Sequence, residues 1–261
     1  MHPRIALARF LLRLGKFVSS LPLMVMRPDD LVEFSRQTYA GDRAVKHWTS
    51  DETLNMGLMP MEQAVFEKIH LNEGKVLVLG VGGGREAIPL AKMGFSVTGV
   101  DFIPELVAMA QENAAKHGVH IETQVGELSH LALPPETFDL VWLSDRMYSC
   151  IPTRKRRLAM LKKIYQALRP GGWFACMFFW YPTSQFSPRV DFLRKVFAYL
   201  TLGNLWYEPG DVLHANVEFI HRFGDEAQLD AEFTAGEFEV MRPYLINQKE
   251  LRGLAILHKP A

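Results

Sequence analysis

Residues 75–84 read Lys75-Val76-Leu77-Val78-Leu79-Gly80-Val81-Gly82-Gly83-Gly84. The Val-Leu-Val-Leu run is typical of a parallel strand that is buried on both faces. The glycines that follow predict a turn tight enough to bring backbone N–H groups against a ligand. We expect a helix near residues 84–93, which would direct its N-terminus at the same ligand. This stretch therefore predicts a strand, a turn and a helix arranged around a bound molecule.

A second strand follows and ends in an acid. Residues 95–100 read Phe-Ser-Val-Thr-Gly-Val, and Asp101 comes directly after them, twenty-one residues after Gly80. A carboxylate at that point of a nucleotide-binding fold accepts hydrogen bonds from the hydroxyls of a ribose. The two strands and the glycine turn together indicate a site for a nucleoside-containing cofactor.

From Lys75 onward the chain alternates between strand patterns and helix patterns. We expect strands near residues 75–80, 95–100, 119–124, 138–143, 172–179, 237–245 and 251–258, and helices near 84–93, 104–117, 153–168 and 225–235. The alternation predicts an α/β fold with a doubly wound, mostly parallel, seven-stranded sheet and a crevice at the carboxyl ends of its strands. The short link at 247–249 leaves no room for a crossover helix, so we expect the last strand to run antiparallel.

Two segments lie outside this alternation. Residues 1–60 are expected to form a helical extension or lid, with helices near 4–18 and 28–39 and a loop through Gly41 and Trp48. Residues 61–261 are expected to form the α/β domain. Within it, the Pro- and Gly-containing stretch at about 182–224 predicts an inserted cap with a helix at 189–202.

The helix expected at residues 4–18 has one basic side and one apolar side. Arg9, Arg13 and Lys16 fall on a narrow stripe. The opposite side is formed by Leu7, Leu11, Leu14 and Val18. Two interpretations fit this pattern: a peripheral contact with a membrane surface, or a lid packed on the domain with its basic stripe in solvent. No apolar run in this segment is long enough to cross a membrane.

The composition excludes several classes of protein. The 29 basic residues balance 29 acidic ones, so the chain has no overall positive field and we expect no nucleic-acid partner. Cys150 and Cys176 are too few for a disulfide framework and favour a reducing, cytoplasmic compartment. His117 and His120 form the one close histidine pair, without a further ligand beside them, so no metal site is expected.

At this point the chain resembles the class I S-adenosylmethionine-dependent methyltransferases, closely over residues 74–181 and more loosely over 217–259. The resemblance rests on the glycine turn, on Asp101, on Gly126-Glu127-Leu128, on Phe138-Asp139-Leu140-Val141-Trp142-Leu143-Ser144 and on Leu168-Arg169-Pro170-Gly171-Gly172. It implies S-adenosylmethionine as cofactor, S-adenosylhomocysteine as product, and methyl transfer to a small or medium-sized acceptor. The cofactor-binding residues that it implies are Gly80, Val81, Gly82, Gly84, Asp101, Phe102, Ile103, Gly126, Glu127, Leu128 and Ser144.

One position departs from the family's pattern. The family usually carries an acid two residues before the first glycine of the turn, and here that residue is Val78. Either Glu86 or Glu62 takes over the contact with the cofactor ammonium, or the chain is a non-catalytic scaffold on a methyltransferase fold. Gly82-x-Gly84-x-x-Ala87 also satisfies the dinucleotide fingerprint, so a nicotinamide-dependent oxidoreductase is the other alternative. Against it, Tyr148 is followed four residues later by Pro152 rather than by lysine.

The segment after the fourth strand is expected to face both the cofactor and the acceptor. Asp145 is a candidate base or acceptor-orienting group, and Tyr148 a candidate pocket residue; a helix cap and a packed aromatic are the alternatives. Arg146 either clamps an anionic acceptor or forms a surface ion pair. Tyr39 and Trp48 either close over the sulfonium or simply pack.

The remaining basic run and the acceptor pocket are placed by the same reasoning. Arg154-Lys155-Arg156-Arg157 opens a helix, where the dipole disfavours cations; we interpret the run as a solvated charge cluster, with an acidic ligand or a membrane surface as the alternative. The acceptor pocket is expected between residues 1–60, 144–157 and the cap.

Overall fold

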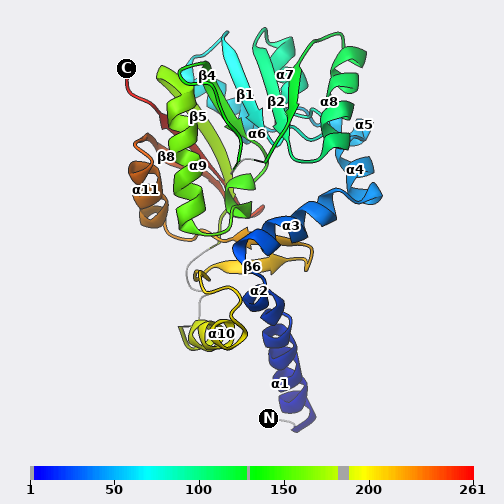
Figure 1. The fold of residues 1–261 in the computed structure, drawn as a ribbon, viewed down its shortest axis with the longest axis vertical. Coiled ribbons are helices and arrows are strands. Elements are labelled where there is room, and N and C mark those ends of the chain that lie inside the picture. The colour runs from blue at the N-terminus through cyan, green and yellow to red at the C-terminus, as the bar shows by residue number, and fades with distance from the viewer. Residues whose placement is uncertain (1–2, 128–129, 182–187) are drawn as a thin grey trace.

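The computed structural model describes residues 3–127, 130–181 and 188–261 (Figure 1). Its centre is a seven-stranded sheet in the order β3-β2-β1-β4-β5-β9-β8. These strands are β1 (Lys75–Leu79), β2 (Ser96–Asp101), β3 (Glu122–Val125), β4 (Phe138–Leu143), β5 (Leu168–Phe179), β8 (Glu239–Asn247) and β9 (Arg252–His258). Only β9 runs antiparallel to its two neighbours in this sheet, β5 and β8. The expected α/β fold and its antiparallel last strand are confirmed.

The central strand β1 is buried because helices cover both faces of the sheet. Val76 and Val78 face a core shared with α6 (Pro60–Ile69), α7 (Ala87–Lys92) and α8 (Pro104–Lys116). Leu77 and Leu79 face a second core shared with α9 (Arg154–Ala167) and α11 (Glu226–Ala235). Alternate side chains of one short strand therefore hold two hydrophobic layers, which is the reason for its uninterrupted apolar sequence.

The helix expected near residues 84–93 is shorter than predicted. It begins at Ala87, because the chain first makes two turns in which the Gly84 N–H donates to the Val81 carbonyl at 2.9 Å. Gly84 has a φ of +104°, which is outside the helical range. The start of the helix is therefore displaced along the chain, and its N-cap residue Glu86 still lines the crevice together with the turn.

The N-terminal extension contains more helix than expected. Its helices are α1 (Pro3–Val18), α2 (Leu21–Val25), α3 (Pro28–Tyr39), α4 (Asp42–Trp48) and α5 (Asp51–Asn55). The expected loop through Gly41 and Trp48 is thus wrong. The sequence does carry a signal for the start of α5. Ser50 is its N-cap and accepts a hydrogen bond from the Thr53 N–H at 3.2 Å, and two acids follow in the first turn.

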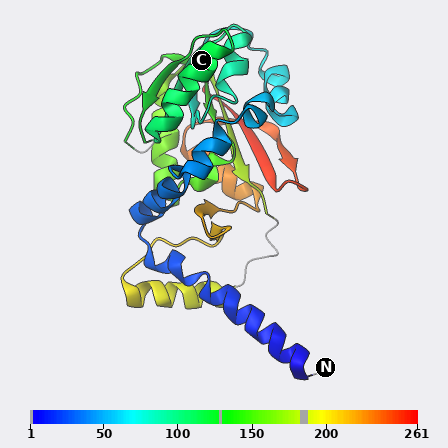
Figure 2. The ribbon, with the colours of Figure 1, turned by 90° about the vertical axis from the view of Figure 1, so that its right-hand side faces the viewer.

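The described part of the cap holds α10 (Pro188–Thr201) and a hairpin of β6 (Asp211–His214) and β7 (Glu218–His221). The helix matches expectation, whereas the hairpin was not anticipated. Its turn places Ala215 and Asn216 at positive φ, as a tight hairpin turn requires. Figures 1 and 2 show α3 and the hairpin together beyond one end of the sheet, between the sheet and α10.

Two hydrogen bonds join α3 to the hairpin. The Thr38 hydroxyl donates to the Val217 carbonyl at 2.7 Å, and the Phe219 N–H donates to the Ser35 hydroxyl at 3.1 Å. The N-terminal extension and the cap thereby form a single roof over the carboxyl ends of the strands.

Arg157 is fully buried, so the interpretation of residues 154–157 as a solvated run is wrong for this residue. Its guanidinium donates to both oxygens of Glu232 on α11, at 2.7 and 2.8 Å. It also donates to Glu208 at the start of the hairpin segment, at 2.8 Å. One cation therefore ties α9 to α11 and to the cap, and its burial is compensated by two carboxylates.

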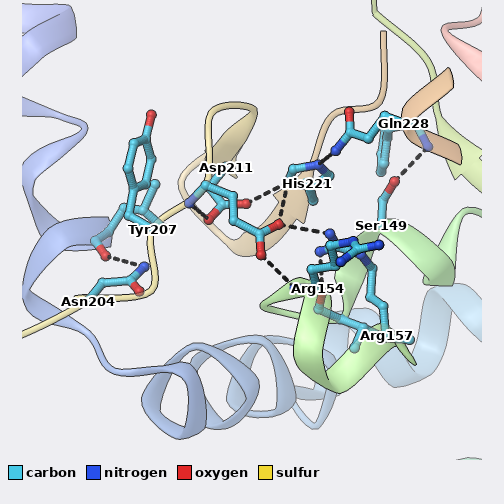
Figure 3. Close-up of polar contacts among 12 residues, drawn as sticks. Ser149, Arg154, Arg157, Asn204, Tyr207, Asp211, His221 and Gln228 are labelled. Atoms are coloured by element: carbon cyan, nitrogen blue, oxygen red, sulfur yellow. Dashed lines mark hydrogen bonds and ion pairs between the residues drawn. The ribbon is translucent and has the colours of Figure 1, made fainter. Parts of the chain in front are cut away.

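A buried histidine extends this network (Figure 3). His221 hydrogen-bonds through Nδ1 to Asp211 at 2.7 Å and through Nε2 to Gln228 at 2.9 Å. His221, Asp211 and Glu208 lie close enough together to have the spacing of metal ligands. The Arg157 guanidinium already occupies the Glu208 carboxylate, so we describe the cluster as an ion-pair network that fixes the hairpin.

This network predicts a large stability difference between two adjacent arginines. Arg157→Met removes the partner of the buried Glu232 carboxylate and should lower the free energy of unfolding by about 3–5 kcal/mol. Arg156→Met is the matched control, because the partner of Arg156 is Asp29, whose side chain is 84% exposed; its cost should stay below about 1 kcal/mol. Urea unfolding followed by circular dichroism measures both, and equal midpoints would contradict the assignment.

Candidate active site

A cavity of about 280 Å³ lies at the carboxyl ends of the strands. Its floor is formed by the glycine turn after β1 and by the ends of β2 and β4. Its roof is formed by α3, the end of α4 and the start of β7. This is the switch point of the sheet, where β1 has β2 on one side and β4 on the other, and it is the usual ligand site of such folds.

The glycine turn brings bare backbone to the cavity wall. Gly80 has a φ of +79°, and a side chain there would collide with the sulfur of Met147. Gly82 has a φ of +52° and faces open space. Gly80, Val81 and Gly82 all line the cavity, whereas Gly84 lies behind the wall against Ile88. A ligand can therefore approach the main chain of this turn closely.

Asp101 lies at the cavity wall and is held by backbone donors. Its carboxylate accepts from the Gly82 N–H at 2.9 Å and from the Ile103 N–H at 3.1 Å. Burial raises the pKa of Asp101, although these donors act in the opposite direction. Each carboxylate oxygen retains a second lone pair for a ligand hydroxyl. Ile103 does not line the cavity; it orients Asp101 through its backbone.

The remaining expected cofactor residues divide into two groups. Phe102, Gly126, Glu127 and Ser144 line the cavity, and Leu128 lies outside the described residues. The Ser144 hydroxyl is buried and has no hydrogen-bond partner in the described part of the chain. A buried unpaired hydroxyl is costly, so this group indicates that a polar ligand atom belongs beside it.

The two candidate catalytic residues lie in different environments. Asp145 lines the cavity and forms ion pairs with Arg252 at 3.1 Å and Arg146 at 3.2 Å. Tyr148, in the 3₁₀ helix η1 (Met147–Cys150), is fully buried and donates to Glu232 at 2.6 Å. It does not line the cavity, so the structure gives it the packed-aromatic role and leaves Asp145 as the candidate.

The roof contributes aromatic and acidic groups. Tyr39 and Trp48 both line the cavity, with ring centroids 6.3 Å apart. The Tyr39 hydroxyl donates a short hydrogen bond to the Glu218 carboxylate on β7. Burial and the neighbouring acids raise the pKa of Tyr39 well above its usual range, which keeps the phenol protonated. Tyr39 and Glu218 thus form a neutral donor and a carboxylate acceptor side by side at the cavity.

Several cavity residues were missed in the sequence. They are Ser35, Arg85, Met147, Cys150, Phe179 and Glu218. Arg85, Met147 and Cys150 lie in segments that were expected to face the ligand, whereas Ser35 and Glu218 reach the cavity only through the packing of the roof against the sheet. Arg146 is paired with Asp145 and covers the ring of Phe179 at 4.3 Å, which agrees with the ion-pair alternative rather than the anion clamp.

The acid missing at Val78 has one replacement within the cavity. Glu62 is buried and bound by Arg85 through two bonds of 2.8 Å, and it does not line the cavity. Glu86 does line it and shares the same guanidinium. Burial raises the pKa of Glu86 to about 7, although Arg85 acts in the opposite direction. Glu86 is therefore the acid positioned to meet a ligand cation.

A comparison with known families finds a match to the central part of the chain. Residues 76–172 match a family described as a methyltransferase domain, and this range includes the glycine turn, Asp101 and Ser144. Residues 76–172 thus form a methyltransferase domain that is similar to the class I S-adenosylmethionine-dependent enzymes. The residues present fit the family's cofactor, since the bare turn, the Asp101 carboxylate and the unpaired Ser144 hydroxyl face one cavity.

Curated relatives of this methyltransferase domain share only part of their length with it. A ubiquinone biosynthesis O-methyltransferase of Paramagnetospirillum magneticum is 39% identical over 103 residues, which cover 39% of each chain. A protein of the same description from Xanthomonas euvesicatoria is 31% identical over 109 residues, 41% of this chain and 44% of that one. An arsenite methyltransferase of Halobacterium salinarum is 34% identical over 101 residues, 37% and 25% of the chains. The chain thus spans less than half the length of these relatives.

Solved structures share the fold. A S-adenosylmethionine-dependent methyltransferase of Methanosarcina mazei has a TM-score of 0.58 and 22% identity, covering 78% of this chain and 99% of that one. A protein of Pyrococcus horikoshii has a TM-score of 0.60 and 18% identity, covering 85% and 98%. These similarities extend beyond the matched domain model to most of the chain.

The position of Asp101 predicts the effect of its removal. Asp101→Ala should weaken S-adenosylhomocysteine binding at least tenfold, because a hydrogen bond to a charged group contributes about 1.5–3 kcal/mol. Glu122→Gln, an exposed acid on the adjacent β3, should bind with unchanged affinity. Isothermal titration calorimetry measures both dissociation constants. Equal affinity of Asp101→Ala and the parent protein would rule out the ribose contact.

The raised pKa of Glu86 predicts pH-dependent cofactor binding. Its carboxylate is protonated as pH falls through about 7, so the ammonium loses its partner and the Kd for S-adenosylmethionine should rise, by at most about tenfold per pH unit. In Glu86→Gln the Kd should be high and nearly constant between about pH 6 and 8. Titrations at several pH values test this, and an unaltered pH dependence in the variant would assign the effect to another group.

Proposed function

We propose that this protein is an S-adenosylmethionine-dependent methyltransferase that acts on a hydroxyl group of a small or medium-sized, largely apolar acceptor. The observation that carries the proposal is one continuous cavity, which joins the glycine turn and Asp101 to a roof built by the extension and the cap. Relatives named as O-methyltransferases support oxygen as the acceptor atom.

When bound, S-adenosylmethionine supplies an electrophilic methyl group on its sulfonium. The bare turn at Gly80–Gly82 admits the amino-acid end of this cofactor, Glu86 receives its ammonium, and Asp101 receives the ribose hydroxyls. Tyr39 and Trp48 line the roof above these residues. Much of the rate enhancement of such a displacement comes from alignment of the acceptor, and orientation of this kind can supply roughly 7–11 kcal/mol.

A hydroxyl acceptor also needs a group that takes its proton. Asp145 faces the cavity, but its carboxylate is held by two guanidinium groups, from Arg146 and Arg252, and this pairing suits it to orienting the acceptor. Glu218 faces the same cavity, and Tyr39 donates a hydrogen bond to it. We assign Glu218 as the general base and Asp145 as the acceptor-orienting residue.

Binding and transfer are tested in sequence. Calorimetric titration with S-adenosylmethionine, S-adenosylhomocysteine and NAD should give binding of the two adenosyl ligands only. Transfer of a radiolabelled methyl group to a panel of phenols and apolar alcohols then identifies the acceptor class. Binding of NAD alone would favour an oxidoreductase, and binding of none of the three would favour a scaffold protein.

The role of Glu218 leads to a separate prediction. Glu218→Gln should lower kcat by about 10²–10⁴, the usual contribution of general acid–base catalysis, while S-adenosylhomocysteine affinity stays unchanged. In Asp145→Asn, loss of acceptor orientation should raise KM as well. Steady-state kinetics over a range of pH compares the two, and a Glu218→Gln enzyme with the parental pH profile would remove Glu218 from this role.

Residues 4–18 and the cellular location complete the proposed function. We infer a peripheral membrane contact for α1, since nearly all its described side chains are exposed and the helix projects away from the sheet (Figure 2). Among the described residues no helix is both long and apolar enough to span a bilayer. Cys150 and Cys176 are unpaired thiols, which supports a reducing, cytoplasmic setting.

A further inference from the structure

Exposed hydrophobic side chains gather at one end of the molecule. Of the large hydrophobic side chains exposed in the described residues, eight lie between Phe192 and Trp206, seven lie on α1, and five are scattered elsewhere. The first group, which we name the α10 patch, consists of Phe192, Leu193, Val196, Tyr199, Leu200, Leu202, Leu205 and Trp206. Concentrations of this kind on a surface mark an interaction site.

Five of the eight residues of the α10 patch lie on one face of α10, a helix that is anchored to the protein by its opposite face. These five residues are spaced at i, i+1, i+4, i+7 and i+8, and they are 40–74% exposed. The opposite face is buried: Ala198 packs with Leu23 and Met24 of α2, and Asp191 accepts a hydrogen bond from the Tyr207 hydroxyl at 2.6 Å. The helix therefore presents most of its large apolar side chains to solvent, while Asp191, Phe197 and Ala198 face the protein; a surface helix on a globular domain normally buries its apolar side.

The charges around the α10 patch are positive. Arg189 and Lys195 are exposed on α10. Asp191 is the single acid between residues 188 and 206, and it is buried. Trp206, at the edge of the patch, belongs to the residue type that favours the interface between headgroups and hydrocarbon. Apolar residues flanked by basic ones match a surface of anionic lipids.

The α10 patch lies at the same end of the molecule as α1. Figures 1 and 2 both place α10 and α1 beyond the roof, on the side away from the sheet. The helix α1 carries Arg4, Arg9, Arg13 and Lys16 and no acid. Two basic, apolar helices from distant parts of the chain therefore extend the same end of the protein.

We propose that the α10 patch docks on an anionic lipid bilayer, with α1 as a second contact on the same surface. A second copy of the chain is a poorer occupant, because a symmetric interface across the patch would bring Arg189 and Lys195 close to their own counterparts. A bilayer of anionic lipids neutralises these charges and covers the apolar side chains together. The proposal does not depend on methyl transfer.

Vesicle flotation with the full-length protein tests this docking. The parent protein should float with vesicles of phosphatidylcholine and phosphatidylglycerol, and much less with phosphatidylcholine alone. The double variant Leu193→Asp/Leu200→Asp keeps α1 intact and should lower the partition coefficient at least about tenfold, since two exposed leucines no longer enter the interface. Met93→Asp, which replaces an apolar side chain of similar exposure outside both groups, should float like the parent protein.

Two further measurements make each outcome decisive. Circular dichroism and the unfolding temperature should be the same for all three proteins, because every substituted side chain is exposed. A folded double variant that floats like the parent protein would overturn the proposal, as would a parent protein that floats with neither vesicle. A stable dimer in light scattering that the double variant abolishes, without vesicle binding, would assign the patch to a second copy and also overturn it.

Discussion

The buried carboxylate of Glu232 holds α9, α11, η1 and the cap together. It accepts two hydrogen bonds from Arg157 and one from Tyr148, and through Arg157 it is linked to Glu208 of the cap. Four separate segments, α9, α11, η1 and the start of the hairpin, thus meet at one ionic centre. Because buried charges are tolerated only with complete pairing, each of these segments holds the others in register. The cavity is shaped by this constraint, since the chain that carries Asp145 leads directly into η1.

A second ionic centre shapes the other side of the cavity. Arg85 lies between Glu62 of α6 and Glu86 of the turn, and it also donates to the Gly57 carbonyl at 2.8 Å. One guanidinium between two acids leaves negative charge in excess, and burial makes that excess costly. Glu86 is the acid of this pair that faces the cavity, so a cationic ligand there would balance the excess negative charge. The loss of an acid at Val78 is in this way compatible with a cofactor that carries an ammonium group.

The sheet was predictable from the sequence because its signals are local. Short stretches of sequence are enough to identify the apolar run of β1, the glycine turn and Asp101. The structure places all three as expected. The start of α7 was predicted too early. Glycines with positive φ postpone the first helical residue, and the spacing of apolar residues does not reveal this. The roof was not predictable: Tyr39 and Glu218 are 179 residues apart, and their pairing depends on how the extension packs against the cap. Tyr148 was misassigned for a similar reason, because its partner Glu232 is distant in sequence.

The roof that joins α3 to β7 has a consequence for the divergence of such enzymes. Ser35 and Thr38 supply one half of its hydrogen bonds, while Val217 and Phe219 supply the other half. Exchange of the cap alone for that of a relative would leave the partners on α3 unmatched. Acceptor selectivity is therefore expected to change through paired substitutions in α3 and in the cap, so that the extension and the cap vary as one unit.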